Sequence, residues 1–151
     1  MSDALADFTT RTKLRLYEII ATTTRVPLVR ELAAELGAPE ADVRAALDEL
    51  RARRLVVIDP GTREIRMAPP FSPVPTPHQG IVDGRTYQAL CVWDAFGVVA
   101  ALGGTGVAVT RSGGTGEELR FPIENWRPRA VDAVFHYAVP AARWWEDIVF
   151  T

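Results

Sequence analysis

Apolar residues recur at helical spacing three times within the first fifty residues. The first stripe lies in residues 8–22, the second ends at Gly37, and the third follows Pro39, a residue favoured at the start of a helix. The members of these stripes are Leu16, Ile19 and Ile20, then Leu28, Leu32, Ala33 and Leu36, then Val43, Ala46, Leu47 and Leu50. Residues 55–58 and 64–67 follow as two short strands around a Pro-Gly turn. Three helices and a β-hairpin predict a winged helix-turn-helix domain at residues 1–68.

Five prolines interrupt the pattern at residues 69–78. They are Pro69, Pro70, Pro73, Pro75 and Pro77. Because proline fixes φ and lacks an N–H donor, this stretch is expected to be neither a helix nor a central strand. We predict an extended, semi-rigid connector that packs through Phe71.

The pattern at residues 79–151 is mixed, which predicts a small mixed α/β-sheet domain and an α+β fold class overall. Helical spacing predicts a helix at residues 86–97, which continues to about 102, and alternation predicts a further strand at 133–139. A glycine-rich turn between two alternating stretches predicts a β-hairpin. The remaining expectations are hairpin strands at 107–110 and 118–121, helical turns at 141–147 and a strand that begins at 148.

Composition narrows the class of protein. The chain has 151 residues, of which 48% are hydrophobic and 24% charged, as in a soluble globular protein. The longest apolar run, residues 96–102, is far shorter than the roughly 20 residues of a membrane span, and no secretory signal opens the sequence. The single cysteine suits a reducing cytoplasm.

The charge distribution bears on nucleic-acid binding. The net charge is −2, and the eleven basic residues of the first 68 are balanced by eleven acidic ones. In the third predicted helix the arginines alternate with Asp48 and Glu49, whereas a recognition helix normally presents unopposed basic side chains. DNA is therefore a partner that the sequence does not favour.

Several other motifs are better explained as structural features than as binding or catalytic sites. The glycine-rich stretches at 103–106 and 112–116 lack the residues of a phosphate-binding loop and are expected to be flexible turns. The two histidines, His78 and His136, do not stand at ligand spacing from each other or from cysteine, so no zinc site is expected. His136 is expected to be a neutral, hydrogen-bonded structural residue.

Cys91 and Asp94 are the candidate chemical pair. Residues three apart on a helix share a face, so the thiol and the carboxyl group can point into one cleft. A thiolate binds mercury or copper(I), and a carboxyl group near Trp93 and Phe96 would have a raised pKa and could donate a proton. By spacing alone, a lone cysteine in an apolar helix is more often a small core residue.

Longer motifs resemble the alkylmercury lyase (organomercurial lyase) family. The residues that carry the resemblance are Ala68-Pro69-Pro70-Phe71-Ser72, Thr76-Pro77, Tyr87, Cys91, Asp94, Ala101-Leu102-Gly103, His136-Tyr137-Ala138-Val139-Pro140 and Trp144-Trp145-Glu146-Asp147. Members of that family also begin with a winged-helix-like module. The resemblance therefore extends over nearly the whole chain, with residues 79–151 as an apparently incomplete lyase-like domain.

The resemblance implies that an organomercurial is cleaved by protonation at carbon, giving a hydrocarbon and Hg(II). Cys91 would take the mercury, and Asp94 would deliver the proton and then help to hold the metal. No added cofactor is implied, and low-molecular-weight thiols would carry off the product.

This chain departs from the family in one respect that matters. Two cysteines act in the family, and this chain has only one. A slow lyase aided by external thiol, a mercurial-binding remnant and a relative with another function all fit this departure. The alternatives outside the lyase reaction are a winged-helix regulator or sensor that binds a thiophilic metal or small molecule, and a core thiol without chemistry.

Overall fold

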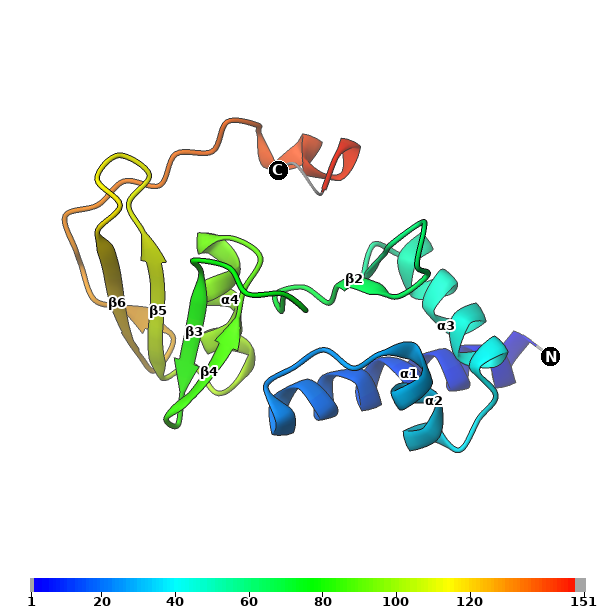
Figure 1. Cartoon of the computed structure of the whole chain (residues 1–151). Helices are drawn as coiled ribbons and strands as arrows, with labels where there is room; N and C mark the ends of the chain where they lie inside the picture. Colours follow the sequence, from blue (N-terminus) through cyan, green and yellow to red (C-terminus); the bar gives the residue numbers. More distant parts are fainter. Residues whose placement is uncertain (1, 149–151) are drawn as a thin grey trace.

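The computed structural model describes residues 2–148, and in its N-terminal part three helices precede a two-stranded hairpin (Figure 1). The helices are α1 (Ser2–Thr23), α2 (Val29–Leu36) and α3 (Glu40–Ala52), and the antiparallel strands are β1 (Val57–Ile58) and β2 (Ile65–Met67). These are the elements that the hydrophobic pattern predicts. The predicted stripe of α3 is confirmed, because Val43, Ala46, Leu47 and Leu50 are all buried.

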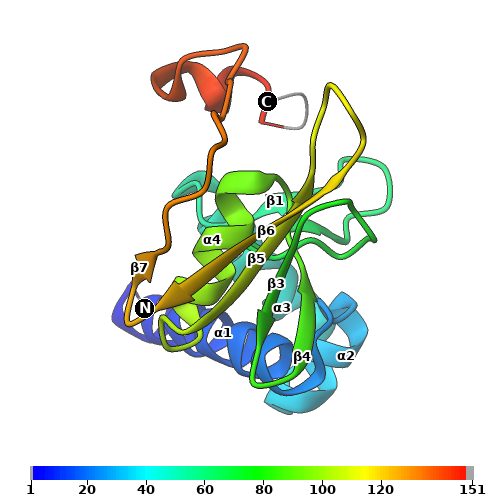
Figure 2. The same cartoon turned by 90° about the vertical axis from the view of Figure 1, so that its left-hand side faces the viewer.

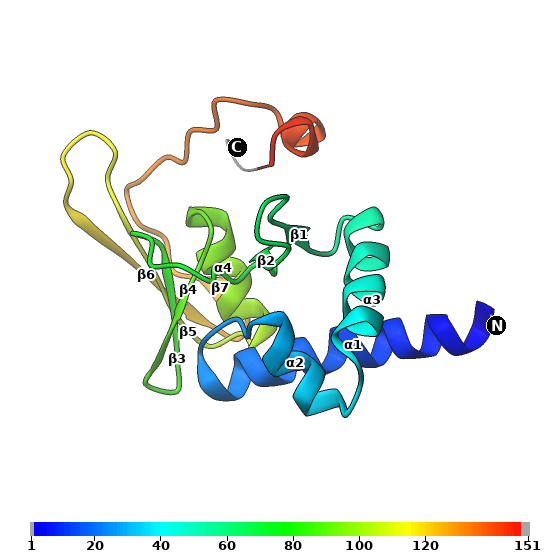
Figure 3. The same cartoon turned by 45° about the vertical axis from the view of Figure 1, so that its right-hand side comes forward.

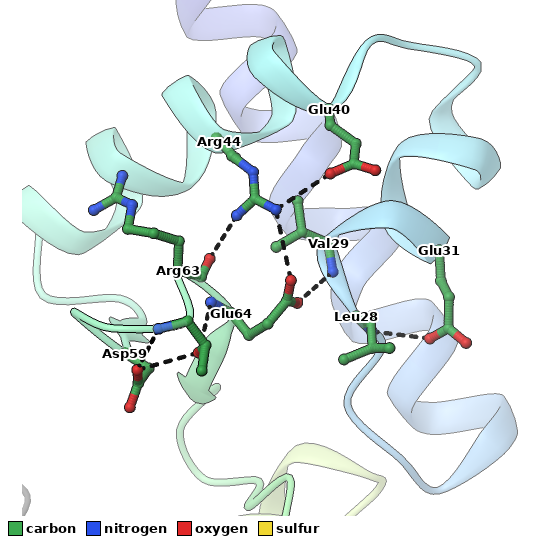
Figure 4. Close-up of polar contacts among 9 residues, drawn as sticks. Leu28, Val29, Glu31, Glu40, Arg44, Asp59, Arg63 and Glu64 are labelled. Carbon is green, nitrogen blue, oxygen red and sulfur yellow. Dashed lines mark hydrogen bonds and ion pairs between the residues drawn. The ribbon is translucent and has the colours of Figure 1, made fainter.

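Both ends of α2 are fixed by local chemistry. Gly37 follows its last turn with a φ of 59°, the left-handed conformation that glycine adopts without strain. At the other end, the Glu31 carboxylate accepts the Leu28 N–H at 2.9 Å, and the Glu64 carboxylate accepts the Val29 N–H at 2.7 Å (Figure 4). Because Glu64 comes from the hairpin, this bond ties the hairpin to the start of α2.

The C-terminal part contains an antiparallel sheet with the strand order β4-β3-β5-β6-β7. The strands are β3 (Gln79–Val82), β4 (Arg85–Gln88), β5 (Gly106–Arg111), β6 (Glu118–Glu124) and β7 (Arg127–Pro128). Helix α4 (Val92–Ala101) packs on β3 and β5 (Figure 2). The close approach depends on Gly80, because a Cβ atom there would lie 2.7 Å from the Cβ of Val98. The predicted hairpin is confirmed as β5 and β6.

The proline-rich connector is not extended at its start, contrary to the prediction, because Ala68 and Phe71 exchange backbone hydrogen bonds of 3.2 and 2.7 Å around a turn at Pro69 and Pro70. It contains no helix, and Phe71 is 3% exposed. The Phe71 ring lies between Tyr17 of α1 and Tyr87 of β4, with ring centroids 6.1 and 6.0 Å away. Both tyrosines also bridge the parts, since Tyr17 donates to the Pro69 carbonyl at 2.9 Å and Tyr87 donates to the Ala21 carbonyl at 2.8 Å. The anchoring role predicted for Phe71 is confirmed.

The prediction of a helix at residues 86–97 is wrong in its first half. Residues 86–88 belong to β4, which pairs with β3 around a turn at Asp83 and Gly84, both with positive φ. The Asp-Gly turn and the strand alternation outweigh the helical spacing of Tyr87, whose ring is buried against Phe71. The helix begins at Val92, so Cys91 is its N-cap rather than an interior residue. Its end before Gly103 and Gly104, both at positive φ, is as predicted.

The prediction of a strand at residues 133–139 is also wrong. This segment is irregular, and Phe135 packs against Phe96 and Phe121, with centroids 5.6 and 5.3 Å away, instead of joining a strand ladder. His136 is exposed, so it is not the structural histidine expected. The helical turns predicted after Pro140 are present as the 3₁₀ helix η1 (Ala141–Glu146). The strand expected from Ile148 is not present at that residue, which lies in a turn, and its remaining positions lie outside the described residues.

Candidate functional site

A cavity of about 920 Å³ lies where four segments meet. The hairpin contributes Arg66, the connector contributes Ser72 and His78, the start of α4 contributes Cys91, and the C-terminal segment contributes Trp144. Figure 3 shows the C-terminal segment, in orange and red, above the β1–β2 hairpin and α4. The cavity therefore has walls from both the N-terminal and the C-terminal parts of the chain.

Cys91 and Asp94 meet in the wall of this cavity. Cys91 has extended backbone angles, with φ −144° and ψ −179°, and its carbonyl accepts the Ala95 N–H at 3.0 Å to start α4. The Cys91 thiol donates a hydrogen bond to Asp94 Oδ2 across 3.3 Å. The predicted proximity of the two groups is thus present, although it arises from N-cap geometry and not from a shared helix face.

The surroundings disfavour negative charge on both groups. Burial raises the pKa of Cys91 to about 11, and the adjacent Asp94 charge adds to this shift. The backbone amides of Asp94 and Trp93 act in the opposite direction, but burial dominates. Burial also raises the pKa of Asp94, against the thiol hydrogen bond, which lowers it. A soft metal that replaces the thiol proton would therefore leave that proton beside a carboxyl group that holds protons more tightly than usual.

Aromatic residues complete this side of the cavity. Tyr137, Trp144 and Trp93 all line it, and the Trp93 side chain is 61% exposed. Burial raises the pKa of Tyr137, and the negative charges of Cys91 and Asp94 raise it further. The sequence places Trp93 near the Asp94 carboxyl group and places Tyr137 and Trp144 in family motifs, but it gives no sign that the three rings line one cavity.

His78 also lines the cavity, from the end of the connector. Its Nδ1 lies 2.6 Å from Thr110 Oγ1, and burial lowers its pKa, which favours the neutral ring. The hydrogen bond to β5 fixes the orientation of the imidazole ring. His78 is therefore a rigid polar wall of the cavity.

Other candidate features of the sequence carry no site in the structure. Within residues 2–148, no three histidine, cysteine, aspartate or glutamate side chains are grouped so that they could hold a metal ion. The stretches 103–106 and 112–116 lie at turns beside β5, and none of their residues lines the cavity. In the same part of the chain, no helix has the length and hydropathy needed to cross a membrane.

The arginines of α3 are engaged by acidic side chains. Arg44 pairs with Glu40 at 3.2 Å and with Glu64 at 3.6 Å, and it donates to the Arg63 carbonyl (Figure 4). The further pairs are Arg51 with Asp48, Arg53 with Glu49 and Arg63 with Asp48. Cations that are already paired contribute less to phosphate binding than free ones.

Comparison with known proteins adds three findings. Residues 71–151 match the alkylmercury lyase family. An alkylmercury lyase of Staphylococcus epidermidis is 32% identical over 104 residues, which are 69% of this chain and 46% of that protein. A crystal structure of the mercury-bound form of MerB2 superposes with a TM-score of 0.57 at 21% identity, over 79% of this chain and 58% of that one.

The matches show the fold and the family of the chain. The superposition supports an α+β architecture like that of MerB2, and the chain spans about half the length of the curated relative that it matches. The family match includes Cys91, Asp94 and the aromatic residues of the cavity, and it extends over more than half of the chain. The chain therefore belongs to the alkylmercury lyase family.

Proposed function

We propose that this protein binds organomercurials through Cys91 and cleaves their carbon–mercury bond with a proton from Asp94. The observation that carries the proposal is the 3.3 Å hydrogen bond between Cys91 Sγ and Asp94 Oδ2 in the cavity wall. Family membership supports the same reaction. Mercury is the substrate's metal here, and no resident cofactor is required.

In the first step, the substrate R–Hg–X exchanges X for Cys91. The Sγ–Hg bond forms, the Hg–X bond breaks, X leaves as an anion, and the thiol proton passes to the Asp94 carboxylate. In the second step, Asp94 gives this proton to the carbon, which leaves as the hydrocarbon RH with the electron pair of the carbon–mercury bond. The Asp94 carboxylate then binds the mercury that remains on Cys91.

A low-molecular-weight thiol supplies the second sulfur that this chain lacks. Two thiol molecules replace Cys91 and Asp94 on Hg(II) and give up their protons, one to the Cys91 sulfur and the other to solvent. Asp94 is then again a carboxylate that can accept the next thiol proton. This requirement favours the cytoplasm as the compartment, because thiols stay reduced there. We expect turnover to be slow and to require added thiol.

The test is methane release from methylmercury, or benzene release from phenylmercury, with thiol present. Cys91→Ser is expected to lose mercurial binding, because serine lacks the soft sulfur donor. Asp94→Ala is expected to keep binding and to lose most hydrocarbon release, since a positioned acid contributes about 10²–10⁴-fold. Asp42→Ala is the matched control, because Asp42 is exposed in the first turn of α3. No release above buffer by the native protein would refute the lyase proposal.

For the remaining organisation, we propose a winged-helix-like domain at 1–68, a connector at 69–78 and a lyase-like domain at 79–151. The ion pairs of α3 support a structural role for the first of these, which shapes the cavity, over DNA binding by a regulator. Gel retardation of duplex DNA at low and near-physiological salt tests this assignment. Tight, sequence-selective binding at the higher salt would favour the regulator.

A further inference from the structure

The β1–β2 hairpin places a cation in the wall of the cavity. Arg66 lies in β2 after Ile65, which is 5% exposed and belongs to the core. Because side chains alternate along a strand, Arg66 lies on the opposite face, and it lines the cavity that also contains Cys91 and Asp94. Among the cavity-lining residues of the described chain, Arg66 is the only lysine or arginine. The N-terminal part therefore supplies the permanent positive charge of a cavity whose reactive pair comes from the C-terminal part.

Arg66 is held in place and keeps free hydrogen-bond donors. Its Nη1 group donates to Asp59 Oδ2 at 3.2 Å. Asp59 is fixed in turn, because its Oδ1 accepts the N–H groups of Gly61 and Thr62 at 2.9 and 2.8 Å and the Thr62 hydroxyl at 3.1 Å. A guanidinium group has further N–H donors besides the one used here, and the Arg66 side chain is 43% exposed. The remaining donors are therefore available to a ligand in the cavity.

The carboxylates of the hairpin leave room for an anionic ligand. Two of them, Asp59 and Glu64, line the cavity. The negative charge of Asp59 is stabilised by the three hydrogen bonds within its turn and by Arg66, and these partners lower its pKa, the Thr62 N–H most of all. Glu64 accepts the Val29 N–H at 2.7 Å and pairs with Arg44 at 3.6 Å. Neither of the two carboxylates is therefore unpaired.

We propose that Arg66 binds the carboxylate of the external thiol, so that the cavity selects acidic low-molecular-weight thiols to take mercury from Cys91. This inference rests on the proposed use of an external thiol. Arginine binds carboxylates through parallel, charge-assisted hydrogen bonds. A small thiol acid such as mercaptoacetate, bound to Arg66, holds its sulfur inside the cavity that contains Cys91, which makes the exchange effectively intramolecular. The incoming sulfur loses its proton as it bonds to mercury, and the Cys91 sulfur gains a proton as its bond to mercury breaks.

The first experiment measures the charge preference at Cys91 without mercury. Iodoacetate and iodoacetamide alkylate a thiolate with loss of iodide, and they are similar in size but differ in charge. The ratio of their rate constants, divided by the same ratio for mercaptoethanol, reports the charge that the reagent meets. Arg66→Gln is expected to lower this ratio about fivefold, because a positive charge in a partly buried cavity attracts the anionic reagent. Arg66→Lys is expected to keep most of the native ratio.

Asp59→Asn is the variant that separates ligand binding from a structural role. Arg66→Gln and Asp59→Asn break the same ion pair, but they remove charges of opposite sign. Asp59→Asn is therefore expected to raise the ratio, whereas a hairpin that was merely loosened would change it in the same direction in both variants. Arg120→Gln is the control outside the cavity, because Arg120 forms an exposed ion pair with Glu118 at 2.9 Å, and it should keep the native ratio.

The second experiment measures removal of mercury from protein loaded with mercuric chloride. At equal thiolate concentrations, mercaptoacetate is expected to remove mercury about fivefold faster than mercaptoethanol, and cysteamine to be slowest. Arg66→Gln should abolish this order. Equal removal rates by the three thiols, or an alkylation ratio that Arg66→Gln leaves unchanged, would overturn the inference. Failure of the lyase proposal has a different signature, which is the absence of hydrocarbon release while the charge preference remains.

Discussion

The carboxylates of the N-terminal helices and those of the cavity respond to their surroundings in opposite ways. Glu31 pairs with Arg25 at 2.7 Å and accepts the Leu28 N–H, and these partners lower its pKa to about 2. Burial raises the pKa of Asp94 instead. The first group is stabilised as an anion and holds a helix end, whereas the second is poised to keep a proton. Such a difference separates structural carboxylates from candidate chemical ones.

Two tyrosines show the same contrast. Burial alone raises the pKa of Tyr17 to about 12, and its hydroxyl is used to bond the Pro69 carbonyl. The pKa of Tyr137 is raised by burial and also by the negative charges of Cys91 and Asp94. Tyr17 therefore fastens α1 to the connector. Tyr137 instead lies close enough to the reactive pair for their charges to affect its pKa.

The largest expected effect comes from exchanging one carboxylate of each kind for its amide. Asp94→Asn is expected to reduce hydrocarbon release by about 10²–10⁴-fold, because the amide cannot deliver the proton. Glu31→Gln, whose side chain lies outside the cavity, is expected to leave release unchanged. Headspace gas chromatography of methane in single-turnover reactions measures both. Equal rates for Asp94→Asn and the native protein would remove Asp94 as the proton source.

The same two variants should change stability with opposite signs. The pKa of Glu31 lies below its unfolded value, so its contribution is present above that value and is lost as the pH falls towards about 2. The pKa of Asp94 is raised, so its ionisation costs stability once the pH exceeds the ordinary value near 3.8. At neutral pH we therefore expect Glu31→Gln to lower the melting temperature and Asp94→Asn to raise it. A melting temperature that falls in both variants would contradict the conclusion that ionised Asp94 destabilises the fold whereas ionised Glu31 stabilises it.

Much of the N-terminal part could be predicted from sequence because its signals agree. The apolar stripe of α3, the glycine after α2 and the anchoring Phe71 each had one strong local interpretation, and the structure confirms them. The site was predicted for a partly wrong reason. Cys91 and Asp94 are adjacent, but Cys91 precedes the helix, because the strand pairing of Tyr87 with Gly80 decides where the helix can begin.

The C-terminal segment shows why the rest could not be predicted. Alternation at residues 133–139 suggested a strand, but Phe135 packs into a cluster with Phe96 and Phe121 that only the folded sheet creates. Trp93 and Tyr137 also line one hollow together, although more than forty residues of sequence separate them. Periodicity reports which face is apolar, and it does not report what that face will contact.

The next largest effect is expected on the free energy of unfolding when Phe71, the anchor between the two parts, is replaced. Phe71→Ala deletes a buried ring between Tyr17 and Tyr87 and is expected to lower the free energy of unfolding by about 3–5 kcal/mol. Phe135→Ala, at a ring that is 38% exposed, is expected to cost about 1 kcal/mol. Urea unfolding measures both values. Equal losses would show that the C-terminal segment is as firmly held as the connector.

The reactivity of the thiol gives a third effect, of about 100-fold. With its pKa raised to about 11 from an ordinary value of 9, Cys91 carries about 100-fold less thiolate at neutral pH than an ordinary cysteine. Alkylation by iodoacetamide should therefore be slower than that of a small thiol by about this factor, and should accelerate up to a midpoint near pH 11. The urea-unfolded chain is the control and should show the ordinary midpoint. A folded-state midpoint below 9 would contradict the dominance of burial.

The smallest effect tests the packing that positions α4. A Cβ atom at Gly80 would collide with Val98, so Gly80→Ala must move the helix from β3 and is expected to cost roughly 1–3 kcal/mol of unfolding free energy. Gly113→Ala is the matched control, because no atom lies within 4 Å of its added Cβ and its φ is not positive. Thermal unfolding at neutral pH compares the two. Since α4 carries Asp94 in its first turn, the Gly80 variant should also lose hydrocarbon release per folded molecule, whereas the Gly113 variant should not. Full release by a destabilised Gly80→Ala would show that the reactive pair is positioned by the Cys91 N-cap and not by the packing of α4 on the sheet.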